Sequence, residues 1–457
     1  MSSAKIVFIF LSALFMGIVP LFVSNRRRYF LFLAGFLYIF SSGWIFYHYT
    51  GLMLADLPVI ALLFTGFVSK EKFSWSVKPV TLPLMLFFLL GIISSFGVTR
   101  QGWVFAELSK YFRMYLIIVA VHNNVKSLKD FKILVYAVLS GLIVEALIGI
   151  YQWRFGAIGL WYLGERPLER IKWRTMGTFY VTSFYANYLA MVLPVAFRLF
   201  VYYKARDRRL VFLTGSALLL GVVAFFTTYG RAPWIAFVSV IGLLTLFSMV
   251  NKKFKSQMKW AFPLIILFFT VFTIRYGDKI LSQFGEQRHS SYEVRFPQFR
   301  IAQRMIKSRP LTGVGLGHYE LVSWDYMTET EKADEYARVF ALMVHNTYLL
   351  IAAEMGVPGS LLLIWFLLSI FVVAIQSIRH KMYSPFILNS VLGAGGGLLA
   401  IVVVFTFSPD IHAYQILYQL GISTGIIIAA KTLQDKARTA KEAAQAKKLK
   451  NRYEIER

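Results

Sequence analysis

The sequence predicts an all-α, polytopic integral membrane protein with about 12 transmembrane helices, counted as 12 or 13, and a large helical outer loop. Three observations predict this fold. Of 457 residues, 57% are hydrophobic and only 16% are charged, which is too much apolar surface for a water-soluble core. Apolar stretches of roughly 18 or more residues, the length that spans about 30 Å of hydrocarbon, recur along the chain. Basic residues gather in alternate short connections, as membrane topology requires.

The apolar segments are taken in chain order. The first, from Ile6 to Val23, has no small-residue cleavage site, so we expect a retained membrane segment and not a signal peptide. Thirteen crossings place the N-terminus outside, whereas 12 crossings require one early stretch to be re-entrant or interfacial. The segments lie near 4–23, 29–49, 51–68, 79–98, 103–121, 131–152, 184–203, 210–228, 232–250, 260–275, 357–377, 385–408 and 411–430.

The basic connections orient the chain. Because Lys and Arg favour the cytoplasmic side, these connections are assigned to the cytoplasm. Residues 431–457 carry nine basic and four acidic side chains and are predicted to form a basic cytoplasmic C-terminal tail. Residues 1–430 form a single transmembrane domain. The cytoplasmic connections are 26–28, 70–78, 126–132, 204–209, 252–259 and 379–381.

Two outer loops, 153–183 and 276–356, are too long to be simple links, so we expect chemistry there. The first contains five basic and two acidic side chains, although positive charge is usually sparse outside. In the second, residues 276–310 hold seven basic and three acidic side chains, and 311–344 hold two basic and six acidic. The excess of positive charge predicts an anionic ligand.

Several basic side chains are candidates for contact with that ligand. Arg300, Arg304 and Lys307 share one face of a helix predicted to begin near Pro297; that face suits lipid phosphates, and direct substrate contact is the alternative. Lys110 and Arg113 are expected near the outer face, where they either bind phosphate or serve as ordinary structural charges. Arg170 and Arg174 belong to the first outer loop.

Three further residues occupy suggestive positions. Arg295 comes before the predicted helix, whose free N–H groups favour an anion. Arg231 lies at the outer junction of two segments, where it either snorkels to a headgroup or binds a substrate anion. His345 opens an apolar helical run at the water boundary, and its near-neutral pKa suits either a structural role or a general base.

Other classes of chemistry lack their signatures. The chain has no cysteine, which excludes disulfides, thiolate catalysis and thiolate metal sites. Gly313, Gly315 and Gly317 form a turn whose spacing is not that of a nucleotide-binding loop, and no H-E-x-x-H or metal-ligand spacing of outer acids occurs. We predict no metal, no cofactor and no nucleic-acid partner.

Five motifs occur in order along most of the chain, and together they resemble the O-antigen ligase and polymerase superfamily of bacterial membrane glycosyltransferases. This chain departs from the family pattern at two places. Gly230 stands where the family often has Ser, and Tyr180-Val-Thr-Ser stands where it often has an Asn-Pro-Asn-like stretch. The motifs are Arg174-Thr-Met-Gly-Thr-Phe, Tyr188 to Pro194, Tyr229-Gly-Arg-Ala-Pro-Trp, Lys307 to His318 with the preceding Arg295, and His345 to Gly359.

The resemblance implies a periplasmic active site in the bacterial inner membrane with Arg231, Arg295 and His345 as the catalytic set. The donor would be an undecaprenyl-diphosphate-linked glycan, and the acceptor a hydroxyl of lipid A-core or another glycan, with membrane lipids around the site. Transfer would be metal-independent and inverting. The substrate-binding candidates are Arg174, Arg170, Arg300, Arg304, Lys110 and Arg113.

Three alternatives remain open. A polysaccharide polymerase would extend a lipid-linked glycan from the same donor, and a protein O-oligosaccharyltransferase would use a protein acceptor. A polytopic secondary transporter belongs to another class and would show inverted repeats and broken helices at mid-membrane, neither of which is clear in the sequence. A flippase would line a path through the membrane with charge, whereas here the charge that could bind a diphosphate is concentrated in the outer loops.

Overall fold

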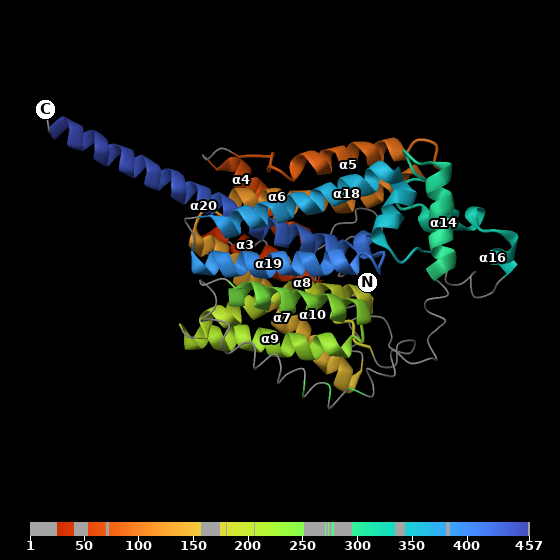
Figure 1. Ribbon diagram of the computed structural model, residues 1–457, viewed down its shortest axis with the longest axis horizontal. Helices are drawn as coiled ribbons and strands as arrows, with labels where there is room; N and C mark the ends of the chain where they lie inside the picture. Colours follow the sequence, from red (N-terminus) through yellow and green to blue (C-terminus); the bar gives the residue numbers. More distant parts are fainter. Residues whose placement is uncertain are drawn as a thin grey trace, which may run out of the picture.

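The computed structural model shows helices running side by side along the long axis of the molecule (Figure 1). It describes residues 25–40, 54–69, 73–156, 174–179, 181–204, 206–250, 270, 273, 277, 295–333, 343–380 and 384–455. Over these ranges the regular structure is helical and no strand occurs. The predicted all-α fold is confirmed.

The helices match the predicted apolar segments closely. Short 3₁₀ helices are η2 (Tyr38–Phe40), η6 (Ser323–Tyr326) and η7 (Asp410–His412). The α-helices are α3 (Arg26–Leu37), α4 (Asp56–Val68), α5 (Thr81–Ser94), α6 (Gln101–Asn124), α7 (Leu128–Phe155), α8 (Thr182–Tyr203), α9 (Arg208–Thr227), α10 (Arg231–Val250), α14 (Arg295–Ser308), α15 (Tyr319–Val322), α16 (Glu329–Ala333), α18 (Thr347–Arg379), α19 (Pro385–Val404) and α20 (Tyr414–Ile455).

Seven helices in the described ranges are long and apolar enough to cross a membrane: α7, α8, α9, α10, α18, α19 and α20. Two shorter apolar helices, α4 and α5, lie alongside. The chain is therefore a polytopic membrane protein. The predicted segment 4–23 and most of 260–275 lie outside the described residues, so the count of 12 or 13 crossings stays a prediction.

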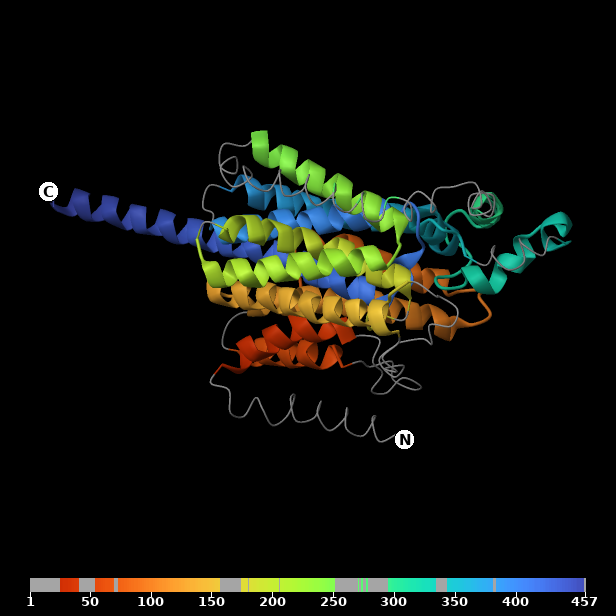
Figure 2. The same ribbon diagram turned by 90° about the horizontal axis from the view of Figure 1, so that it is seen from below.

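Helix α8 is the centre of the bundle, because nearly every side chain along it is buried. It packs against α9, α10 and especially α19, and Figure 2 shows α3 and α10 on opposite flanks. Glycines in α19 permit the close approach: a Cβ on Gly397 would lie 1.9 Å from the carbonyl oxygen of Met191, and one on Gly393 would lie 2.5 Å from the Cα of Val195. Small residues bring membrane helices together in this way.

The two ends of the bundle are built differently. At one end, Asp130 accepts hydrogen bonds from Arg27 Nη2 at 3.0 Å and Arg28 Nε at 2.6 Å. His380 Nε2 lies 3.3 Å from Asp435 Oδ1, where the side chains of α20 change from buried to exposed. Beyond the bundle, α20 continues as a single helix (Figure 1). Each contact joins two segments that the sequence assigns to the cytoplasm. At the opposite end, α14 lies across the bundle and α16 extends beyond it.

Helix α18 is broken at Gly356, whose φ of 72° and ψ of 173° are not helical. The turn before α15 fills the break: the amides of Val314 and Gly315 donate to the carbonyls of Ala353 and Glu354, and Val357 N donates to Pro310 O, each at 2.9 Å. Broken backbone hydrogen bonds inside a membrane need such partners. The glycine-rich motif therefore has a structural role as a clamp on α18.

Candidate active site

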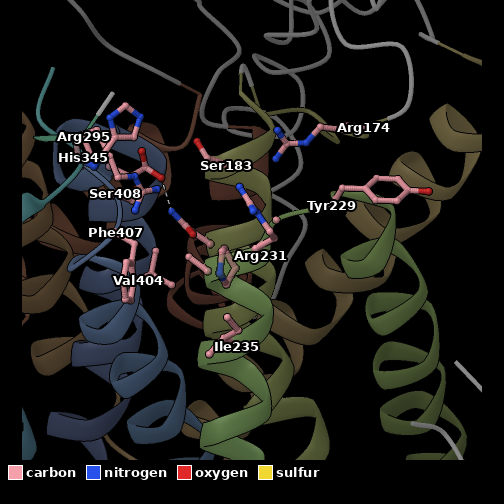
Figure 3. A pocket seen from close by; sticks show the side chains of 16 residues that line it. Arg174, Ser183, Tyr229, Arg231, Ile235, Arg295, His345, Val404, Phe407 and Ser408 are labelled. Atoms are coloured by element: carbon pink, nitrogen blue, oxygen red, sulfur yellow. Dashed lines mark hydrogen bonds between the residues drawn. The ribbon is translucent and has the colours of Figure 1, made fainter. Parts of the chain in front are cut away.

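A pocket of about 430 Å³ opens at the end of the bundle where α14 lies (Figure 3). Arg231, Arg295 and His345, the three predicted catalytic residues, all line it, and so does Arg174. The full lining is Arg174, Ser183, Asn187, Tyr229, Gly230, Arg231, Ala232, Pro233, Ile235, Arg295, His345, Val404, Phe407, Ser408, Pro409 and Asp410.

Four helices begin at this pocket. Arg231 is the first residue of α10, Arg295 is the first of α14, Ser183 lies in the first turn of α8, and His345 precedes Asn346, the N-cap of α18. Helix N-termini present N–H groups and positive dipole ends, so their convergence favours an anion. The guanidinium groups add charge to an already positive environment.

Both arginines start their helices in the same local sequence, Arg-x-Pro. Pro233 and Pro297 occupy the first turn, where a missing N–H leaves no intrahelical bond unmade and the fixed φ suits the helix. Helix α14 begins at Arg295, two residues before the predicted Pro297 start. The arginine therefore belongs to the helix and does not precede it.

Arg174 is held against the turn that leads into α10. Its Nε donates to Thr228 O at 2.8 Å. Beside it, Thr175 N donates to Thr227 O at 3.1 Å, and the hydroxyls of these two threonines lie 2.7 Å apart. Tyr229 follows with a φ of 51°, an uncommon left-handed conformation for a residue with a side chain. The turn thereby sets Arg174 and Arg231 on the same pocket wall.

His345 is oriented by Gln298 of α14. Its Nδ1 lies 3.0 Å from Gln298 Oε1 and 3.2 Å from Met343 O, both hydrogen-bond acceptors. The backbone N–H of His345 donates to the same Gln298 oxygen at 3.3 Å, which supports that orientation of the amide. The proton of the neutral ring therefore belongs on Nδ1, leaving the Nε2 lone pair available as a base.

The surroundings of His345 also favour its neutral form. Burial lowers its pKa below the ordinary value of 6.5, and the positive charge of Arg295 lowers it further, whereas the Met343 carbonyl acts in the opposite direction. The imidazole is therefore unprotonated at neutral pH. A neutral imidazole at the edge of a cationic pocket can accept a proton from a hydroxyl group.

The two residues after His345 form hydrogen bonds with the pocket segment 404–410. Asn346 caps α18 by accepting from Leu349 N at 2.9 Å and donates to Thr406 O at 3.1 Å. Thr347 donates through its N–H to Phe405 O at 2.8 Å and through its hydroxyl to Ser408 O at 2.7 Å. The His-Asn-Thr sequence therefore fixes the pocket segment 404–410 to the start of α18.

Asp410 was not predicted as a site residue, yet it is the one acidic residue among the described residues that line the pocket. It is buried and accepts a hydrogen bond from Asn187 Nδ2 of α8 (Figure 3). Burial raises its pKa to about 6, although hydrogen bonds from Ser408, Asn187 and Ser183 act in the opposite direction. The signal in the sequence was a rare acid at the outer junction of the last two apolar segments.

The remaining candidates that the structure describes do not line the pocket. Arg300 Nε lies 3.4 Å from Glu331 Oε1, and Arg304 is hydrogen-bonded to the same carboxylate, so the cationic and acidic halves of the long loop meet here. Arg113 Nη1 lies 3.6 Å from Asp56 Oδ2. Lys110 contacts Glu107 and donates to His412 O. Arg170 lies outside the described residues.

His412, two residues after Asp410, anchors η7. Its Nδ1 lies 3.0 Å from Glu107 Oε2 of α6, and its Nε2 lies 2.8 Å from Glu354 Oε2 of α18. Burial lowers the pKa of His412, but the two carboxylates outweigh burial and raise it to about 10. A charged His412 therefore holds together α6, α18 and the segment that carries Asp410.

One family model matches part of the chain. Residues 215–364 match the O-antigen ligase family model, about a third of the chain. The match contains Arg231, Arg295 and His345, whereas Arg174 and Asp410 lie outside it. No curated protein matches the chain significantly. The family supports a glycosyltransferase of the ligase or polymerase type. Residues 215–364 are therefore similar to the O-antigen ligase family, which is also the family that the sequence motifs indicate.

Proposed function

We propose that the protein transfers a glycan from undecaprenyl diphosphate to a hydroxyl of lipid A-core at the periplasmic face of the bacterial inner membrane. One observation carries this proposal: three arginines, a neutral histidine and four helix N-termini converge on one pocket. Helix α14, whose first residue lines the pocket, lies at the end of the bundle opposite the basic tail (Figure 1). The distribution of Lys and Arg supports a periplasmic position for that end.

The donor's diphosphate is the leaving group. The acceptor oxygen forms a bond to the anomeric carbon as the bond from that carbon to the diphosphate breaks, so a single displacement inverts the anomeric centre. Arg231 and Arg295 would bind the oxygens on which negative charge grows, each through a planar fork of donors. Arg174 would support the same group from the neighbouring turn. Neither a metal nor a nucleotide is required.

The acceptor hydroxyl loses a proton in this displacement. His345 Nε2 would receive it, because Nδ1 is committed to Gln298 and Met343. Asp410, with Ser183 and Asn187, would provide polar contacts for sugar hydroxyls. The apolar side chains of Ile235, Val404 and Phe407 line the same pocket and suit the start of the polyprenyl chain.

The test is transfer in vitro from an undecaprenyl-diphosphate glycan, with lipid A-core and a second lipid-linked glycan offered together. We expect product on lipid A-core, reduced about 100-fold or more in Arg231→Lys, Arg295→Lys and His345→Ala. Lysine keeps the charge but loses the planar fork, so the arginine variants test geometry. Arg209→Lys, at an exposed arginine in the first turn of α9, is the matched control and should retain full activity.

The outcomes separate the alternatives. Extension of the lipid-linked glycan would identify a polymerase, and transfer to a co-supplied acceptor protein would identify an oligosaccharyltransferase. Solute flux in proteoliposomes without glycan transfer would replace the enzyme proposal by a transporter. Full activity of all three site variants would reject the proposed site.

A further inference from the structure

Residues 174–179, which carry Arg174 to the pocket, are docked on two polar side chains of α7. Gln152 Oε1 accepts from Met176 N at 3.2 Å and from Gly177 N at 2.9 Å, and its Nε2 donates to Gly177 O at 2.7 Å. Two turns earlier, Glu145 Oε2 accepts from Thr178 N at 3.1 Å. Both side chains are buried. A membrane helix therefore holds the backbone of an outer-loop segment.

The hydrogen bonds around Thr178 indicate the protonation state of Glu145. Thr178 Oγ1 lies 2.8 Å from Ile39 O, which only accepts, so the single hydroxyl proton of Thr178 belongs there. The same oxygen lies 2.5 Å from Glu145 Oε1. Two oxygens at this distance need a proton between them, and Glu145 must provide it. In the described part of the chain, no ion pair involves Glu145, and an isolated buried carboxyl favours its neutral form.

Gly177 allows the backbone of residues 174–179 to lie very close to Glu145 and Tyr185. Its φ is +57°, and a Cβ on this residue would lie 2.2 Å from Glu145 Oε2 and 2.9 Å from Tyr185 Cε2. Only glycine fits both the backbone conformation and the space. The segment is therefore seated directly on the Glu145 carboxyl group.

The docked segment also fixes the positions of two arginines that line the pocket. Thr175 pairs with Thr227 through backbone and side chain, and Arg174 Nε donates to Thr228 O. The residues that follow Thr228 lead into Arg231 at the start of α10. Displacement of 174–179 would therefore move Arg174 and disturb the turn before Arg231.

We propose that Glu145, as a neutral carboxylic acid, is a positioning residue that docks residues 174–179 and so places Arg174 in the pocket. Glu145 itself does not line the pocket. The effect on donor binding rests on the proposed glycan transfer, whereas the docking does not. The experiment therefore needs one readout that is independent of activity.

Hydrogen–deuterium exchange provides that readout. All five amides from Thr175 to Phe179 donate hydrogen bonds, so a peptide covering this segment should exchange slowly. Glu145→Ala should raise its exchange rate on the order of 10-fold or more, since docking is lost. Glu145→Gln should leave exchange unchanged, because an amide offers the same donor and acceptor as a neutral acid.

The kinetic readout follows from the displacement of Arg174. Glu145→Ala should raise the KM for the lipid-linked donor about 10-fold, and Glu145→Gln should restore the natural value. In an Arg174→Ala background, Glu145→Ala should have a smaller effect on KM, because only the disturbance of the turn before Arg231 then remains. If Glu145→Ala fails to fold, Thr178→Val and Thr178→Ser form a second pair, of which only the serine keeps the hydroxyl group.

Two results would overturn the proposal. Equal damage by Glu145→Gln and Glu145→Ala would mean that the natural residue acts through a negative charge. Unchanged exchange or an unchanged donor KM in Glu145→Ala and Thr178→Val would remove the positioning role. If the natural protein transfers no glycan, the proposed function fails, and the exchange experiment still decides the docking.

Discussion

His345 and Gln298 lie 47 positions apart in the chain, and their contact decides which ring nitrogen can act as the base. The sequence predicts the histidine as a candidate because its residue type and boundary position suit a base. Gln298 offers no such signal, since an amide on a predicted basic helix is an ordinary surface residue. The tautomer depends on this tertiary contact.

Replacing Gln298 tests the assignment of the proton to Nδ1. Gln298→Leu removes the side-chain acceptor and should lower kcat about 10-fold or more with little change in KM, because the ring can then adopt the other tautomer. Gln298→Glu keeps an acceptor but adds a negative charge, which raises the pKa of His345. The acid limb of kcat/KM should then move to higher pH. A full rate in Gln298→Leu would contradict the assignment.

The burial and raised pKa of Asp410 lead us to expect that this residue lowers the stability of the protein at high pH while serving its activity. Its pKa is raised from 3.8 in the unfolded chain to about 6 in the folded protein, so the folded state binds the proton more tightly. The stability associated with this group is full below pH 3.8 and is lost as pH rises through about 6. At about pH 8 the buried charge therefore costs up to about 3 kcal/mol.

Asp410→Asn should relieve that cost, since an uncharged amide still reaches Asn187. The variant should have a higher Tm than the natural protein at about pH 8, an advantage that shrinks as pH falls below about 6, and its glycan transfer should be reduced. Thermal unfolding in detergent at several pH values measures the difference. A constant or negative difference in Tm across pH would contradict the buried charge.

At the scale of elements, the break in α18 matters most, because Glu354 lies on the outer part of this helix and His345 comes just before it. The sequence predicts a helical run that ends at Gly356 and a new apolar segment from 357, and the structure confirms the interruption. The partner that fills it was not predictable, since the turn at 310–315 reaches the break through backbone groups alone. Such contacts do not depend on side-chain type.

Gly356→Ala should destabilise the protein, because its Cβ would lie 2.5 Å from the carbonyl carbon of Leu311 and its φ is +72°. The backbone conformation alone costs about 1–3 kcal/mol. Gly242→Ala in α10 is the matched control, since a Cβ there meets nothing within 4 Å. We expect a lower Tm for Gly356→Ala and an equal or slightly higher Tm for Gly242→Ala. Equal values would show that the clamp contributes little.

At the scale of the whole molecule, hydropathy and charge predict the helices, their alternation and the end of the bundle where we propose that the chemistry occurs. These properties follow from the bilayer, which acts on each segment separately. The pocket itself depends on which helix ends meet. Arg231, Arg295 and His345 were predicted from residue type and family motifs, whereas Asp410 and Glu145 depend on contacts with Asn187 and Thr178 across the bundle.

The orientation of the molecule is testable because the chain has no cysteine, so one introduced thiol is the only reactive one. Lys307 on α14 and Arg209 on α9 are both exposed and lie in segments assigned to opposite sides. A membrane-impermeant maleimide added to intact cells should label Lys307→Cys, and should label Arg209→Cys only after the inner membrane is permeabilised. The natural protein should not react. Labelling of Arg209→Cys alone would place the pocket in the cytoplasm, where a periplasmic transferase could not work.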